Sequence, residues 1–176
     1  MVEEWLDVIG YEGFYQVSNL GRVRSVDRSI VRKNGKIFYK KGRVLKQTLD
    51  SHYPRFQVSL CKNGVENLVR VHTLVASAFL GSPPKGLIVC HGTKGSLCNE
   101  IANLYYGTHE TNSKDKVRDG TSNRGEKHHK VKLTEKDVIA IRVNKESLSD
   151  QCWAERLNVS RRAVNAAKNG QTWSWL

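Results

Sequence analysis

The residues of this sequence best suited to chemistry lie between positions 90 and 112. Cys90 and His91 come directly after the apolar run at 87–89, Asn103 stands twelve residues after His91, and Asn112 follows in a polar stretch. An imidazole titrates closest to neutral pH, so His91 is the most suitable general base here. Phosphodiester hydrolysis needs such a base to activate water, and a cation to offset charge on the phosphate. The alternative for His91 is a histidine whose partners are satisfied within a hydrophobic core.

The segments around His91 predict a helix, two strands and a second helix. The first helix is indicated by apolar residues at helical spacing, Val71, Leu74, Val75, Ala78 and Phe79. Gly81 and the prolines after it end that helix. Residues 87–89 indicate a short buried strand, residues 92–99 a polar loop, and residues 103–106 a second strand. Thr108 is a suitable N-cap for a helix through about Arg118. This order places His91 at the end of a strand and Asn112 on a helix.

On these residues the sequence resembles a known family. The run VHTLVASAFLGSPPKGLIVCHGTKGSLCNEIANLYYGTHETNSKDKVRDGT is similar to the HNH homing endonucleases common in bacteriophages, whose core is a ββα-metal fold. The opening WLDVIGYEGFYQVSNLGRVRSV resembles the amino-terminal DNA-binding module often fused to such nucleases, and the tail resembles the helix-turn-helix that often follows them. The resemblance implies that His91 is the general base and that Asn103 pins the loop between the strands and keeps His91 oriented. It also implies that Asn112 offers an oxygen to one divalent metal ion.

The sequence departs from the family pattern at two cysteines. Many relatives have a carboxylate or histidine as a second metal ligand where this chain has Cys90, and many have Asp where it has Cys98. Mg²⁺ or Mn²⁺ is the expected ion, and Zn²⁺ is the alternative if the softer thiolate of Cys90 is a ligand. Asp115, one turn after Asn112, is a further candidate that acts through water. The four cysteines form no CxxC pair, so no four-cysteine zinc site is predicted.

Composition points to a polyanionic partner. The 176 residues include 29 Lys and Arg against 17 Asp and Glu, a formal net charge of +12, with a pI near 9.7. Double-stranded DNA is therefore the expected partner, and structured RNA is an alternative. With 39% hydrophobic residues the chain is expected to fold. No apolar run reaches the roughly 20 residues of a transmembrane helix. The acidic start is unlike a secretory signal, so the host-cell cytoplasm is the expected location.

The amino-terminal third combines strand signals with basic residues. Between residues 22 and 46 ten basic residues stand against one acid. Asn34-Gly35 and Asn63-Gly64 are hairpin signals between apolar runs, and for Asn34-Gly35 a type I′ turn is predicted. A small antiparallel sheet with one basic face is therefore predicted, and phosphate binding is favoured over a merely solvated face. The candidate contacts are Arg22, Arg24, Arg28, Lys33, Lys40, Lys41 and Arg43.

The carboxy-terminal third predicts helices again after a basic linker. Thr134 and Asp137 indicate a capping box, residues 149–157 a second helix, and Ser160 the cap of a third helix that ends at Asn169-Gly170. The last two helices have the spacing of a helix-turn-helix, with a plain helical hairpin as the alternative. Such a third helix would present four residues to a DNA groove, namely Arg161, Arg162, Asn165 and Lys168.

Together these features predict an α+β protein of three modules and a linker. The predicted parts are an amino-terminal β module at 1–69, a ββα-metal core at 70–121, the linker at 122–132 and a helix-turn-helix at 133–176. The expected function is a site-specific DNA endonuclease, monomeric on DNA, that leaves 5′-phosphate and 3′-hydroxyl ends by resemblance. The alternative is a non-enzymatic DNA-binding regulator whose nuclease core has decayed, for which Cys90 is the main support.

Overall fold

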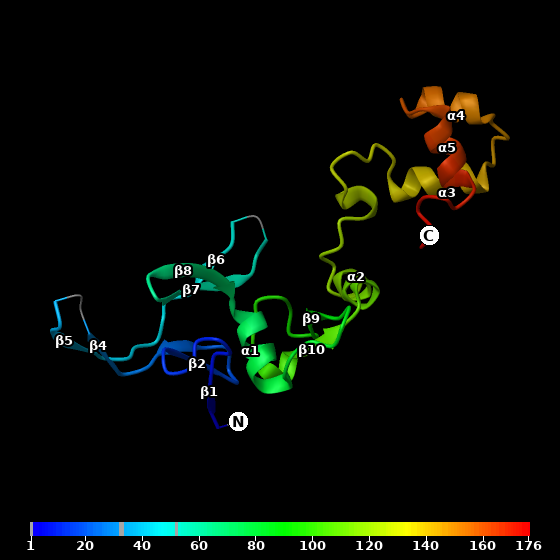
Figure 1. The fold of residues 1–176 in the computed structure, drawn as a ribbon. Coiled ribbons are helices and arrows are strands. Elements are labelled where there is room, and N and C mark those ends of the chain that lie inside the picture. Colours follow the sequence, from blue (N-terminus) through cyan, green and yellow to red (C-terminus); the bar gives the residue numbers. More distant parts are fainter. Residues whose placement is uncertain (1, 32–33, 52) are drawn as a thin grey trace. The chain divides into compact units, whose positions relative to one another are not determined.

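The computed structural model describes residues 2–31, 34–51 and 53–176, and the chain forms two compact units, residues 1–120 and residues 121–176 (Figure 1). The first unit holds all ten described strands with helices α1 and α2, and the second holds α3 to α5. The predicted α+β class with small antiparallel sheets is confirmed. The finer boundaries after residues 69, 121 and 132 stay predictions. Among the described residues, no helix has the length and apolar character needed to span a membrane.

The described part of the first seventy residues forms three small antiparallel sheets rather than one. The first sheet has the order β1 (Trp5–Asp7), β2 (Tyr15–Ser18), β3 (Val23–Ser25). The second is a two-stranded hairpin of β4 (Arg28–Val31) and β5 (Ile37–Lys40). The third has the order β6 (Thr48–Leu49), β7 (Phe56–Lys62), β8 (Val65–Arg70). The described residues of the β4–β5 hairpin lie outside the core, because all four residues of β5 are exposed and none of β4 is buried.

The two Asn-Gly pairs form different turns. Asn63 and Gly64 have φ angles of 54° and 80° and connect Lys62 directly to its partner Val65, as a two-residue hairpin turn with positive φ at both positions requires. The predicted β4–β5 pairing is confirmed, but β4 ends at residue 31, which pairs with residue 37. This register does not fit the predicted two-residue turn at Asn34-Gly35. Residues 32–33, including the candidate DNA contact Lys33, lie outside the described residues.

Helix α1 (Val71–Leu80) joins the amino-terminal sheets to the rest of the first unit. Val71 and Val75 are fully buried and pack in one core with Val17 of β2 and Leu60 of β7. The helix ends at Gly81, whose φ of 80° is a conformation that favours glycine. The same core reaches Leu104, so the segment around His91 is anchored on the amino-terminal sheets.

The segment around His91 is a β-hairpin followed by a helix. It consists of β9 (Ile88–His91), the short 3₁₀ helix η1 (Ile101–Asn103), β10 (Leu104–Gly107) and α2 (His109–Arg118). The Thr108 hydroxyl accepts a hydrogen bond from the Thr111 amide at 3.1 Å, which confirms the predicted N-cap. In β9, His91 pairs with Leu104 of β10. Successive strand residues face opposite sides, so Cys90 and His91 are presented to different surroundings.

The second unit is helical. Its elements are the 3₁₀ helix η2 (Gly125–Lys127), α3 (Glu135–Val143), α4 (Asp150–Arg156) and α5 (Arg161–Lys168). The predicted capping box is confirmed, because the Thr134 and Asp137 side chains each accept a hydrogen bond from the other's backbone amide. Asn158 takes the left-handed conformation, with φ of 50°, in the turn between α4 and α5. Ile141, Trp153 and Val164 bring the three α-helices into one core.

Candidate active site

His91 is buried and is contacted on two sides. Its side chain is 7% exposed, and its Nε2 lies 3.2 Å from Oδ1 of Asn99 in the loop between β9 and η1. The ring of His72, from α1, meets the His91 ring edge to face, with centroids 5.0 Å apart. The side-chain carbonyl oxygen of Asn99 can only accept a hydrogen bond, so it pairs with the neutral tautomer that carries its proton on Nε2. In that tautomer Nδ1 keeps its lone pair.

The surroundings of His91 favour its neutral form. Burial lowers the pKa of His91 below its ordinary value of 6.5, and the hydrogen bond with Asn99 opposes that shift. Because burial is the larger effect, the imidazole is unprotonated at neutral pH. A neutral imidazole is the form that accepts a proton from water, so this environment suits a general base.

Asn103 ties together the loop that carries Asn99. Its Nδ2 donates to the carbonyl oxygens of Gly95 and Cys98 at 3.0 and 2.9 Å, and its Oδ1 accepts from the Lys94 amide at 3.0 Å. The Asn103 carbonyl also accepts from the Gly92 amide at 2.7 Å. These side-chain hydrogen bonds go to the loop backbone and not to His91, so the effect of Asn103 on the histidine passes through the loop. Sequence reasoning does not find Asn99, since nothing separates it from the other polar residues of residues 92–99.

Cys90 faces α2 and not the His91 side. A Cβ placed on Gly107 would lie 3.0 Å from the Cys90 Sγ and 3.4 Å from the Thr111 Cβ, so the thiol is packed beneath the start of α2. It is fully buried. Burial, and then the nearby charge of Asp115, raise the pKa of the Cys90 thiol. At neutral pH the sulfur therefore keeps its proton in the metal-free protein, and a metal ion would have to displace that proton in order to bind the thiolate.

Oxygen donors come from α2. Asn112 is half-buried on this helix, and Asp115 follows one turn later on the same face. The Asp115 carboxylate accepts hydrogen bonds from the Tyr105 hydroxyl and, at 2.8 Å, from Nη1 of Arg118. The bond to Asp115 raises the pKa of Tyr105 to about 12. Within the described ranges, no three His, Cys, Asp or Glu side chains gather around a common point suited to a metal ion. The donor set thus offers hard oxygens, which suit Mg²⁺ or Mn²⁺ better than Zn²⁺.

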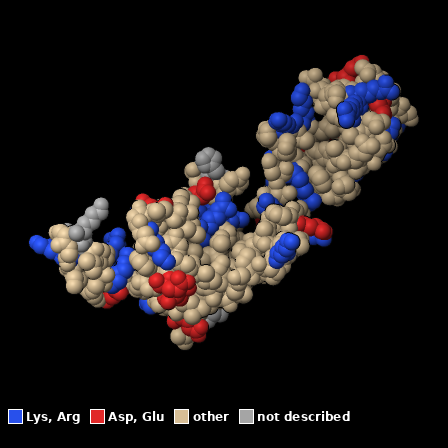
Figure 2. All heavy atoms as spheres, in the orientation of Figure 1, with Lys and Arg blue, Asp and Glu red and all other residues tan. Residues whose placement is uncertain are grey.

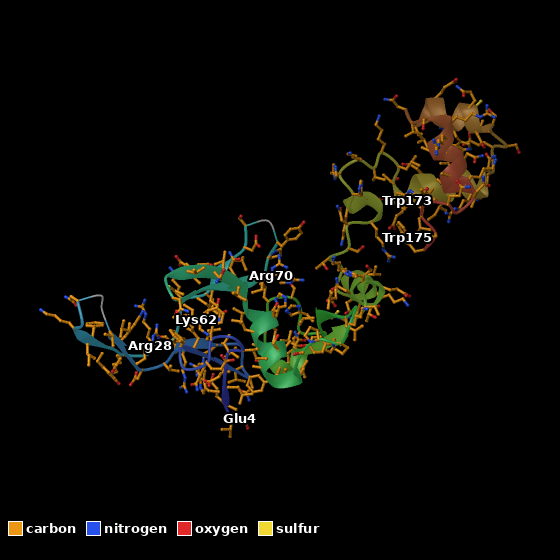
Figure 3. All side chains as sticks on the ribbon, in the orientation of Figure 1. Glu4, Arg28, Lys62, Arg70, Trp173 and Trp175 are labelled. Atoms are coloured by element: carbon orange, nitrogen blue, oxygen red, sulfur yellow. The ribbon has the colours of Figure 1, made fainter. Side chains whose placement is uncertain are left out.

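Three candidate DNA-binding arginines are engaged within the protein. Arg22 forms an ion pair with Glu3, with its Nε 2.8 Å from Oε1. Arg24 donates to Gln16 Oε1 at 2.7 and 3.0 Å and lies over the Trp5 ring, 4.2 Å from its centroid. Arg28 lies 5.0 Å from the Phe14 ring centroid, and Figure 3 shows it near the start of β4.

The remaining described candidates in this third of the chain are exposed. They are Lys40, Lys41 and Arg43. Figure 2 shows Lys and Arg side chains on either side of a mostly uncharged surface at the end of the first unit that β4 and β5 form. Ile37 and Tyr39 of the same hairpin are 73% and 60% exposed. The hairpin therefore presents positive charge together with apolar and aromatic side chains, a combination found in nucleic-acid contacts.

Helix α5 carries the candidate groove residues of the second unit. Arg161 and Arg162 are exposed at its first turn. Lys168 Nζ lies 2.8 Å from Asp150 Oδ1, and Asn165 Nδ2 donates to Asp150 Oδ2 at 3.3 Å. Two of the four candidates on α5, Asn165 and Lys168, therefore bind Asp150 of α4. The other two, Arg161 and Arg162, are exposed.

The basic stretch before α3 packs on the end of the chain. The Arg124 guanidinium lies 4.7 Å from the Trp175 ring centroid, and a Cβ on Gly125 would come within 3.1 Å of the Trp173 ring. The ring centroids of Trp173 and Trp175 are 5.4 Å apart, and both side chains are labelled in Figure 3. Arg142 of α3 donates to the carbonyls of residues 167, 172 and 173. Part of the predicted linker is therefore held against the helical unit.

Comparison with known proteins identifies related sequences. Residues 3–61 match the family model described as the NUMOD4 motif, and residues 69–114 match the one described as HNH endonuclease. The chain is 31% identical over 173 residues to DNA endonuclease I-HmuI of Bacillus phage SP01, which covers 95% of this chain and 90% of that protein. It is 28% identical over 120 residues to an uncharacterized HNH endonuclease of Acanthamoeba polyphaga mimivirus, covering 68% of this chain and 32% of that protein.

One solved structure is similar to this chain over most of its length. It is described as DNA binding and cleavage by the HNH homing endonuclease I-HmuI, and it matches with a TM-score of 0.54 and 28% identity. The match covers 93% of this chain and 88% of that one. The resemblance inferred from the sequence is thereby confirmed over nearly the whole length. The chain belongs to the HNH endonuclease family, in the group of the phage homing endonucleases.

Proposed function

We propose that this protein is a site-specific endonuclease of double-stranded DNA in which His91 is the general base. The observation that carries the proposal is the state of His91, which is buried, neutral at physiological pH and bound through Nε2 to Asn99. A fixed, unprotonated imidazole at the end of a rigid strand is poised to take a proton from water. A relative that matches 95% of the chain is itself a DNA endonuclease, which supports DNA as the substrate.

In this mechanism Nδ1 of His91 takes one proton from a water molecule. The hydroxide so formed attacks phosphorus, the bond to the 3′-oxygen breaks, and that oxygen leaves with a proton from solvent, giving 5′-phosphate and 3′-hydroxyl ends. Asn99 keeps the second ring nitrogen occupied, and so defines which nitrogen is free to react. Asn103 keeps the Asn99 loop closed through its bonds to residues 94, 95 and 98.

Asn112 and Asp115 are the residues that would hold a divalent cation, which would offset negative charge on the scissile phosphate and the leaving oxygen. The amide oxygen of Asn112 is a direct ligand in this proposal. The Asp115 carboxylate accepts hydrogen bonds from Tyr105 and Arg118. It would therefore hold the cation through a water molecule, or directly if the cation replaced Arg118. Cys90 packs beneath the site and is not a ligand.

The basic surfaces bind the duplex in this proposal. Phosphates are contacted by Lys40 of the β4–β5 hairpin and by Lys41 and Arg43 in the segment that follows β5. Helix α5 enters a groove with Arg161 and Arg162, as the second helix of a helix-turn-helix. Arg22, Arg24 and Arg28 keep their partners within the protein in this proposal and attract the DNA only through their positive electrostatic potential. One copy of the chain carries both surfaces, so a monomer on DNA is sufficient.

A non-enzymatic DNA-binding regulator is the second candidate, and the buried thiol at position 90 favours it, since this position lacks a carboxylate. A nicking assay on supercoiled plasmid with Mg²⁺, Mn²⁺ or Zn²⁺ separates the two. The endonuclease requires metal-dependent nicking by the wild type that EDTA and His91→Ala both remove. Tight DNA binding without nicking under every metal condition would support the regulator instead.

A further inference from the structure

The turn between β2 and β3 is packed directly against the loop that carries Asn99. Gly21 in this turn has φ of +83°, and a Cβ placed on it would lie 3.0 Å from the Asn99 Cβ and 3.1 Å from the Asn99 carbonyl carbon and oxygen. Nearby, the Ile101 amide donates to the Asn19 carbonyl at 2.8 Å. The backbone of the turn therefore lies directly against Asn99, with no room for a Cβ at position 21.

The other end of Asn99 meets the proposed catalytic histidine. Its Oδ1 lies 3.2 Å from His91 Nε2, and the residue is 6% exposed. Asn103 closes the loop from the opposite side through the carbonyls of Gly95 and Cys98. Asn99 is thus held between the β2–β3 turn and the imidazole.

From this contact we infer that Gly21 and Asn99 are positioning residues for His91, so that the β2–β3 turn of the amino-terminal sheet sets the orientation of the imidazole. The inference rests on the proposed role of His91 as general base. Gly21 has this role because only a residue without Cβ allows the turn to approach the Asn99 backbone so closely. The amino-terminal sheet then has a second task beside DNA contact, since it forms one wall of the catalytic loop.

A pair of glycine variants tests the role of the turn. Gly21→Ala adds a Cβ at a positive φ and against Asn99, whereas Gly64→Ala adds a Cβ at a matching φ of +80° with nothing within 4 Å. Both variants carry similar backbone strain, but only the first displaces Asn99. We expect Gly21→Ala to lower kcat about tenfold or more, beyond any effect of Gly64→Ala, with KM for DNA unchanged. Equal kcat values for the two folded variants would overturn the inference.

A second pair tests Asn99 with a readout other than turnover. Asn99→Leu keeps the volume and removes the acceptor, and Asn99→Asp keeps an acceptor oxygen. We expect Asn99→Leu to lower kcat about 10²-fold and Asn99→Asp to retain activity within about tenfold of wild type. Long-range ¹H–¹⁵N NMR of the His91 ring in metal-free protein should show the Nε2–H tautomer in wild type and in Gly64→Ala. Mixed tautomers are expected in Asn99→Leu and in Gly21→Ala.

The two readouts separate this inference from the proposed function. If His91→Ala cleaves DNA as well as wild type, the general-base proposal is wrong, while the NMR spectra still report whether Gly21 and Asn99 orient the ring. An unchanged His91 tautomer in both Asn99→Leu and Gly21→Ala would overturn the positioning role even if both variants cut more slowly.

Discussion

The imidazoles of His72 and His91 meet at 64° with their centroids 5.0 Å apart, and one of them has an unsatisfied nitrogen. Among the described residues, no polar atom lies within hydrogen-bond reach of the buried Nδ1 of His72. Burial, and next the neighbouring His91, lower the pKa of His72 to about 3. His72 is therefore a neutral ring that packs against the candidate base.

The first prediction concerns the pH dependence of stability. His72 has a lower pKa in the folded protein than its ordinary value of 6.5, so the unfolded chain binds more protons below that pH. Its favourable contribution is complete above pH 6.5 and is lost as the pH falls toward 3, by about 1.4 kcal/mol per pH unit. His72→Phe keeps the aromatic contact and removes this titration. Urea unfolding between pH 4.5 and 7.5 should give a flatter stability curve for His72→Phe, and parallel curves would contradict the assignment.

The second prediction concerns His91. His91→Ala should lower cleavage by about 10²–10⁴-fold and leave DNA affinity nearly unchanged, because a general base acts in the chemical step and adds little binding. Single-turnover cleavage on a denaturing gel and a DNA-binding titration measure the two quantities. Residual cleavage above about a tenth of the wild-type rate would be too high for loss of a general base.

Local signals in the sequence were sufficient for most of the secondary structure. The Thr134–Asp137 capping box, the Thr108 N-cap and the end of α1 at Gly81 all follow from contacts within a few residues, which a linear sequence displays. The division of the strands into three sheets depends on pairing between distant segments and was not predictable. The chemistry of its imidazole indicates His91, and the family pattern indicates Asn103 and Asn112, but the surroundings of these residues are visible only in the structure.

The contacts missed by the sequence join side chains from different elements of the fold. Asn99 is recognisable only once the loop folds onto His91, and His72 only once α1 crosses β9. Periodicity likewise gives no sign that Arg24 lies over Trp5, nor that Arg124 lies over Trp175. The type of a polar or basic residue therefore indicates its charge and its possible chemistry. It does not indicate whether the side chain is already bound to another part of the folded protein.

The third prediction concerns the β4–β5 hairpin. Replacing Lys40, Lys41 and Arg43 together by Gln should weaken DNA binding and make it less salt-dependent, with the log–log slope reduced by about 0.9 for each phosphate that the variant no longer neutralises. The single variant Lys145→Gln, at an exposed site of the second unit, is the control and should leave the slope unchanged. Fluorescence anisotropy of labelled DNA between 50 and 200 mM salt measures the affinity and its salt dependence for each variant. An identical slope in wild type and the triple variant would remove this hairpin from the DNA interface.

The fourth prediction concerns the second unit. A chain ending at residue 120 should fold and retain metal-dependent nicking, because residues 1–120 form one compact unit with their own core. Site preference should be lost or relaxed, since each good base contact from Arg161 or Arg162 is worth about 1–3 kcal/mol. Cleavage of a random duplex library measures the site preference of the truncated chain. The full-length variants Arg161→Gln and Arg162→Gln are measured alongside it. Retention of the same preferred site would place specificity in the amino-terminal sheets.

The last prediction concerns Cys90 and the metal. The buried thiol lies beneath Gly107 and near Asp115, so Cys90→Ser should be close to neutral for cleavage, as expected for a packing residue. Cys90→Asp would bury a carboxylate beside that of Asp115, and the unfavourable desolvation and repulsion should lower the melting temperature. Asn112→Ala should instead remove most activity and weaken Mn²⁺ binding with little change in melting temperature. Calorimetric Mn²⁺ titrations and thermal melts of the three variants distinguish these effects. If Cys90→Asp binds Mn²⁺ more tightly and cleaves faster with Mg²⁺, position 90 belongs to the metal site, and the gain of a hard oxygen ligand outweighs the cost of its burial.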